Sequence, residues 1–103
     1  NEELKFIDNS ILFIKSESNY CEIHLEENNN YRKELLRGSL NSIEDSLKEL
    51  SFFVRVHRSY IVNLNKIDKV SGTAQGYKVY FKNVEHSVPV SRKQSAHFIS
   101  LVS

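Results

Sequence analysis

Apolar and polar residues alternate over short stretches along most of this chain. In the clearest stretch, Val54 and Val56 can share a buried face while Arg55 points the other way. The alternation resumes at Tyr60, after a polar loop of histidine, arginine and serine at 57–59. Two strands are therefore predicted to meet at a loop that offers hydrogen-bond donors to a partner outside the fold.

Short runs rich in Ile, Val, Phe and Tyr recur along the chain, with turn-forming residues between them. This spacing predicts a mainly β fold of antiparallel strands. The predicted strands are residues 4–7, 11–15, 20–25, 31–36, 53–57, 60–63, 67–70, 77–82 and 86–90. Hairpin loops are predicted at 26–30, 71–76 and 82–85.

One segment between the predicted strands has helical periodicity instead. Apolar residues recur there at three- and four-residue steps between Leu40 and Leu50, which predicts a helix over residues 41–50. Asn41 and Glu44 have the spacing of an N-cap residue and its capping-box partner.

A second helix is predicted to begin at Ser91. The Ser91 hydroxyl can cap the first turn, Gln94 lies three residues further on, and Pro89 helps to end the preceding strand. The first turn of this helix would present Arg92 and Lys93.

Length and composition fit a single domain. A chain of 103 residues with 40% hydrophobic residues is long enough for one core and too short for two ordinary domains. It has no apolar run that could cross a bilayer or act as a signal peptide, and a lone cysteine is what a reducing compartment permits. We expect a cytoplasmic fragment with no membrane contact, and the abrupt start at Asn1 indicates that it is cut from a longer protein.

Charge is divided unevenly along the chain. Residues 1–50 carry six Lys and Arg against eleven Asp and Glu, a net charge of −5, whereas residues 51–103 carry eight against two, a net charge of +6. A local positive field of this kind can attract a polyanion. Without further motifs, an ordinary solvated surface would be the preferred explanation.

Patterns for catalysis and metal binding are weak. Cys21 and His24 have the spacing of a zinc turn, but their odd separation within a strand puts them on opposite faces, which makes Cys21 a core residue. His57 and Ser59 suggest a nucleophile, yet no carboxylate lies nearby in the sequence to orient the histidine. The three glycines are scattered and form no phosphate-binding loop. We therefore expect no enzyme activity, no metal and no cofactor.

Two polar tips have a composition suited to DNA. Each follows an apolar strand and sets an arginine beside a hydroxyl, at His57-Arg58-Ser59 and at Ser91-Arg92-Lys93. Arginine suits guanine O6 and N7 in the major groove, whereas serine, lysine and backbone amides suit phosphates. Each tip alone is a modest signal, because arginines on loops are commonly just exposed to solvent.

Two other classes of partner fit the same residues. An exposed β edge could dock a protein, which the acidic first half favours, so a protein-protein interaction module is one alternative. Tyr80, beside Lys78 and Lys82, could instead stack single-stranded RNA. A structural explanation of that strand is preferred, with Tyr77, Val79 and Phe81 in the core and the two lysines in solvent.

Five segments match a known family in order and spacing. They are residues 11–14 (ILFI), 18–20 (SNY), 37–40 (RGSL), 53–63 (FVRVHRSYIVN) and 88–92 (VPVSR). In these segments the chain resembles the LytTR DNA-binding domain, the output module of a class of bacterial two-component response regulators. The central segment is long and specific.

The resemblance implies a fold, a partner and an assembly. It implies an elongated arrangement of small antiparallel sheets with one or two short helices, in which loops enter successive major grooves of bent double-stranded DNA. It further implies imperfect direct repeats bound by two copies, a role in transcription regulation, and an N-terminal receiver domain in the full-length protein.

The resemblance also assigns roles to individual residues of the three DNA-reading loops. Asn19 can pair with adenine or close an Asx-turn, and His57 can donate to a phosphate or hold its loop in shape. Lys15 and Lys93 suit phosphates, because an ammonium is a point charge and not a planar fork. The base-contacting residues implied are Asn19, Arg58 and Arg92, and the backbone-contacting or loop-shaping residues are Lys15, His57, Ser59, Ser91 and Lys93.

Overall fold

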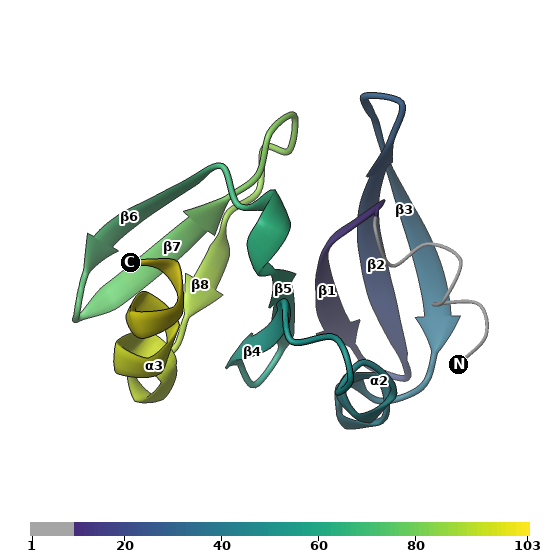
Figure 1. Cartoon of the computed structure of the whole chain (residues 1–103). Helices are drawn as coiled ribbons and strands as arrows, with labels where there is room; N and C mark the ends of the chain where they lie inside the picture. Colours follow the sequence, from purple (N-terminus) through teal and green to yellow (C-terminus); the bar gives the residue numbers. More distant parts are fainter. Residues whose placement is uncertain (1–9) are drawn as a thin grey trace.

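The alternating segments form two antiparallel sheets, with an α-helix packed beside each (Figure 1). This computed structural model describes residues 10–103. The five-stranded sheet has the order β3-β2-β1-β5-β4, and the three-stranded sheet has the order β6-β7-β8. The predicted fold class, small antiparallel sheets with short helices, is confirmed. The strands are β1 (Ile11–Glu17), β2 (Tyr20–Glu27), β3 (Asn30–Arg37), β4 (Phe53–His57), β5 (Tyr60–Asn63), β6 (Lys69–Thr73), β7 (Gly76–Tyr80) and β8 (Val88–Val90).

Helix α2 (Leu40–Ser46) is capped by a different residue from the one predicted. Ser39 is the N-cap, because it stands in an extended conformation just before the helix and its hydroxyl accepts a hydrogen bond from the Ser42 N–H at 3.1 Å. The assignment of Asn41 as N-cap and Glu44 as its capping-box partner was wrong. Both lie inside the helix, where their side chains are free to make other contacts.

The same helix is shorter than the predicted span of 41–50. After Ser46 the backbone tightens, and the Leu50 N–H donates to the carbonyl of Leu47, three residues back, at 2.9 Å. Such a bond closes a turn narrower than that of an α-helix. Leu47 and Leu50 nevertheless pack against the core, which explains the helical periodicity of the sequence.

Helix α3 (Arg92–Val102) begins at the predicted place but not by the predicted contact. The Ser91 hydroxyl makes no capping hydrogen bond. The Ser91 carbonyl oxygen acts instead, and it accepts from the Gln94 N–H at 3.0 Å and from the Ser95 hydroxyl at 3.1 Å.

Several strand ends also differ from the sequence predictions. The loop predicted at 71–76 is mostly strand, since β6 continues to Thr73 and β7 begins at Gly76. A 3-10 helix, η2 (Leu64–Lys66), delays the start of β6 to Lys69. The strands predicted at 77–82 and 86–90 are shortened to β7 and β8. The strand predicted at 4–7 lies outside the described residues.

The five-stranded sheet is buried on both faces near its centre. Neighbouring residues of one strand enter opposite clusters, such as Ile61 and Val62 of β5. One cluster lies under α2 and comprises Ile11, Ile14, Cys21, Ile23, Leu25, Leu40, Ile43, Leu47 and Ile61. The other joins the two sheets and α3 and comprises Leu12, Phe13, Val56, Val62, Val79, Phe81, Val88, Val90 and Phe98. These clusters hold both sheets and both helices in one body.

Cys21 and His24 lie on opposite faces of β2, as predicted. Cys21 belongs to the cluster under α2, whereas the His24 ring stacks on Phe13 in the other cluster, with ring centroids 4.1 Å apart. Both ring nitrogens of His24 are engaged, Nδ1 with the Tyr31 hydroxyl at 2.6 Å and Nε2 with Glu22 Oε1 at 2.9 Å. The zinc-like spacing therefore reflects core packing. Within residues 10–103, no helix is long and apolar enough to cross a membrane.

A glycine in the second sheet supports a testable prediction about the fold. Gly72 has φ +103°, and a Cβ there would collide with the carbonyl oxygen of Gly76 across the hairpin. Gly72→Ala should therefore lower the free energy of unfolding by about 2 kcal/mol or more. Gly76→Ala is the matched control, because its Cβ would meet open space, and it should change stability by less than about 1 kcal/mol. Equal urea midpoints for the two variants would contradict this account.

Candidate nucleic-acid interface

Three polar segments that are distant in sequence lie side by side along one edge of the molecule. They are the β1–β2 turn at 18–19, the β4–β5 turn at 58–59, and the start of α3, all in the lower part of Figure 1. The Ser16 N–H donates to the Ser59 carbonyl at 2.9 Å, which joins the first segment to the second. The Ser91 N–H donates to the Val56 carbonyl at 2.9 Å, which joins the third to the second.

The strand register explains why these segments meet. β1 pairs antiparallel with both β2 and β5, so that Glu17 lies opposite Tyr20 and Lys15 opposite Tyr60. The C-terminal end of β1 and the N-terminal end of β5 therefore lie at the same end of the sheet. The β4–β5 hairpin stands between the two neighbours and is the central element of the edge.

The central turn lacks the backbone geometry that usually stabilises a short hairpin. His57 pairs with Tyr60 across a two-residue turn, and neither Arg58 nor Ser59 has a positive φ. Two-residue hairpins favour turns with positive φ, because those match the twist of the strands. The remote β2–β3 turn has that geometry, with φ of 53° and 66° at its two asparagines. The strand pairing also shifts between Arg55 and His57, so this irregularity and other contacts together give the central turn its shape.

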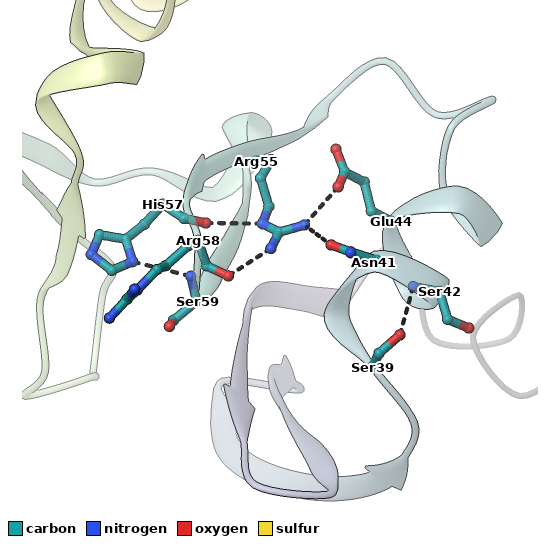
Figure 2. A network of polar contacts seen from close by, with 8 residues as sticks. All are labelled: Ser39, Asn41, Ser42, Glu44, Arg55, His57, Arg58 and Ser59. Atoms are coloured by element: carbon teal, nitrogen blue, oxygen red, sulfur yellow. Dashed lines mark hydrogen bonds and ion pairs between the residues drawn. The ribbon is translucent and has the colours of Figure 1, made fainter.

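Arg55 supplies most of those contacts (Figure 2). Its Nε donates to the His57 carbonyl at 2.9 Å, and one terminal nitrogen donates to the Arg58 carbonyl at 2.6 Å. The other terminal nitrogen donates to Asn41 Oδ1 at 2.9 Å and to Glu44 Oε1 at 2.7 Å. One guanidinium thus ties the turn to helix α2.

His57 adds a contact within the turn. Its Nδ1 accepts a hydrogen bond from the Ser59 N–H at 3.1 Å, which requires that this nitrogen carries no proton. Burial lowers the pKa of His57 below 6.5, and the nearby positive charges of Arg58 and Arg55 lower it further. The ring is therefore neutral near pH 7. Of the two roles considered for His57, this contact fits the loop-shaping one.

The central turn and the start of α3 enclose a shallow groove of about 420 Å³. Arg58 is exposed, and Figure 2 shows its side chain pointing away from Arg55. The groove therefore brings two of the three predicted loops together. Its lining residues are Arg55, His57, Arg58, Ser91, Lys93 and Gln94.

The remaining predicted residues lie around this groove or apart from it. Arg92 is exposed in the first turn of α3, and Asn19 is exposed in the β1–β2 turn, where its carbonyl accepts from the Gly38 N–H at 3.3 Å. Lys15 lies apart, on the face of the five-stranded sheet, and its Nζ is 3.1 Å from Glu17 Oε1. A role for Lys15 in phosphate contact stays a prediction.

Arg55 is the important residue that the sequence analysis missed. The alternation places its side chain opposite Val54 and Val56, and no sequence signal indicates that it bends back to the turn. Asn41 and Glu44 carried a signal, because three residues of separation puts them on one helix face, but that signal was assigned to capping.

Comparisons with known proteins identify the family and the fold. A family model described as the LytTr DNA-binding domain matches residues 4–103, which include all three segments. An uncharacterised response regulatory protein of Vibrio cholerae serotype O1 is 34% identical over 92 residues, 88% of this chain and 34% of that protein. The chain thus spans about a third of that relative. A solved LytTr DNA-binding domain from Bacillus cereus shares the fold with a TM-score of 0.75 at 24% identity, over 92% of this chain and 83% of that one.

The environment of His57 supports a prediction about its pKa. Ring-proton NMR should give a pKa below 6.5 for His57, and Arg58→Ala should raise it by removing a nearby positive charge. Arg92→Ala removes an arginine that is not among the groups lowering this pKa, and it is the control. A His57 pKa unchanged by Arg58→Ala would contradict the described turn.

The lowered pKa of His57 also determines how the stability of the fold changes with pH. Because folding lowers the pKa of His57, the unfolded chain binds the proton more readily. The contribution of this residue to stability is therefore present above about pH 6.5 and is lost as the pH falls through the lower folded-state pKa.

Proposed function

The chain belongs to the LytTR DNA-binding domain family, and on this basis we propose that it is the sequence-specific double-stranded DNA-binding output domain of a bacterial response regulator. The observation that carries the proposal is the alignment of three polar segments along one edge, with Arg58 and Arg92 exposed there. Because the members of this family are DNA-binding domains, membership also supports a role without enzyme activity. Because bacterial response regulators bind DNA in the cytoplasm, we propose a cytoplasmic location for the domain.

In the proposed mechanism, some residues position the protein on the DNA and others read the bases. Contacts from Lys15, Ser91 and Lys93 to phosphates would set the register of the protein on the duplex. Asn19, Arg58 and Arg92 would then contact base edges in successive major grooves. Support comes from Arg58, whose exposed guanidinium makes no hydrogen bond to any side chain or backbone group among residues 10–103. Its donors are available to a partner.

The proposed assembly extends beyond this chain. Two copies would bind imperfect direct repeats, each reading one repeat with the same edge. Because the chain spans about a third of its curated relative, which is described as a response regulatory protein, we further propose an N-terminal receiver domain in the full-length protein.

The two alternative partners receive less support from the structure. The ring of Tyr80, the residue considered for stacking RNA, has Lys69 Nζ 4.8 Å from its centroid, and its hydroxyl is 3.4 Å from Ser71 Oγ. One face of that ring is therefore covered. An exposed leucine, Leu35, on edge strand β3 favours protein docking. That site lies on a different strand from the three aligned segments.

Selection of duplexes from a random pool with this domain tests the proposal directly. The selected duplex should compete for the protein far better than a scrambled duplex or either of its single strands, and separating its two repeats should weaken binding. Preference for the single strands would support the RNA alternative. Absence of nucleic-acid binding at low salt would support protein docking.

Two substitutions separate reading from positioning. Arg58→Ala should weaken binding to the cognate duplex by about 1–3 kcal/mol and relax the preference at one base pair. Lys93→Ala should weaken all duplexes alike and reduce the slope of log affinity against log salt by about one. Equal loss of cognate and scrambled binding in Arg58→Ala would show that Arg58 contacts only phosphates.

A further inference from the structure

Arg55 differs from the other arginines of the edge because its donors are already used. It makes four hydrogen bonds, and its side chain is 21% exposed. A guanidinium has five N–H donors in a rigid fork, so little capacity remains for a base or a phosphate. Arg55 is therefore poorly suited to read DNA itself.

The two carbonyls that Arg55 binds are those on either side of the Arg58 α-carbon. The His57 carbonyl belongs to the peptide plane before that atom, and the Arg58 carbonyl belongs to the plane after it. Each trans peptide unit is planar, so fixing a carbonyl fixes the direction of its whole plane. Two fixed planes determine φ and ψ of Arg58 and hence the direction of its Cα–Cβ bond. One guanidinium thus fixes the direction in which the Arg58 side chain leaves the backbone.

Helix α2 in turn fixes the orientation of the Arg55 guanidinium. Asn41 and Glu44 stand three residues apart on one helix face, and both accept from the same terminal nitrogen. Glu44 pairs with Arg55 at 2.7 Å, which makes this bond charge-assisted. The neighbouring acid Asp45 points elsewhere and pairs with Lys48 at 3.5 Å. The coupling therefore runs through one particular carboxylate of the helix.

We propose that Arg55 is a positioning residue for sequence discrimination, through which Asn41 and Glu44 of α2 hold the central turn in its reading conformation. The proposal rests on the proposed function and extends it to residues to which no DNA contact has been assigned. Specificity at the base pair read by Arg58 is then set partly by α2, which is not one of the three proposed reading segments.

Charge-matched variants test this relay, by which Asn41 and Glu44 act on the central turn through Arg55. Arg55→Lys keeps the charge but loses the fork, so the ratio of cognate to scrambled affinity should fall about ten-fold while the salt slope stays unchanged. Glu44→Gln should lower the same ratio by a smaller factor. Asp45→Asn is the matched control, because it removes the same charge from the next residue, and it should leave the ratio unchanged. A wild-type ratio in both Arg55→Lys and Glu44→Gln would overturn the proposal.

A double-variant comparison separates positioning from general destabilisation. If Arg55 acts through Arg58, then Arg55→Lys should cause no further loss of discrimination in a protein that already carries Arg58→Ala. Additive losses would show that Arg55 acts independently and would overturn the proposal. A fall in the salt slope of about one for Arg55→Ala, without any change in discrimination, would assign Arg55 to a phosphate instead.

A measurement without DNA keeps this proposal distinct from the proposed function. In the free protein, Glu44→Gln should shift the amide NMR signals of Arg58 and Ser59, whereas Asp45→Asn should not. If the wild type fails to select any duplex, the proposed function fails, and these amide shifts alone show whether α2 holds the turn. Unchanged signals in Glu44→Gln would overturn the relay even if the domain binds DNA selectively.

Discussion

Two backbone hydrogen bonds determine the arrangement on which the rest of the structure depends. The Ser59 carbonyl accepts from Ser16 N–H and the Val56 carbonyl accepts from Ser91 N–H, each at 2.9 Å. Because both acceptors belong to the β4–β5 hairpin, the hairpin fixes the positions of its two neighbours relative to itself. Buried valines, such as Val56 and Val62, anchor the hairpin in the core that joins the two sheets. Packing in this core therefore fixes the order in which the three polar segments lie along one edge.

Two arginines of the same hairpin lie in opposite environments. Arg55 is partly buried and satisfied by four acceptors, whereas Arg58, three residues on, is exposed. A partly buried guanidinium is favourable only when its donors are paired, and here the partners include a carboxylate and the turn it supports. The cost of partly desolvating the Arg55 guanidinium is thus offset by its hydrogen bonds, two of which hold the backbone on either side of the Arg58 α-carbon. This division explains how a turn without positive φ can keep one conformation.

The sequence predicted those features that depend on local periodicity. Strand β5 has the predicted ends, and Cys21 and His24 lie on the predicted faces of β2, because a period of two leaves little freedom. Features that depend on distant partners were not predictable. Glu44 looked like a capping residue because a local rule considers only its own helix, whereas its partner Arg55 lies 11 residues away in a strand. The assignment of the three loops to DNA reading came from the family resemblance and stays a prediction, and their meeting along one edge depends on the strand register.

The central claim is that the three aligned segments form the main part of the surface proposed to meet the DNA. The most direct measurement is a titration of the nitrogen-15-labelled domain with its selected duplex, followed through amide chemical shifts. The account predicts that the largest shifts fall at residues 18–19, 57–59 and 91–94, with little change along β3. Large shifts concentrated on β3, with those three segments unchanged, would contradict it.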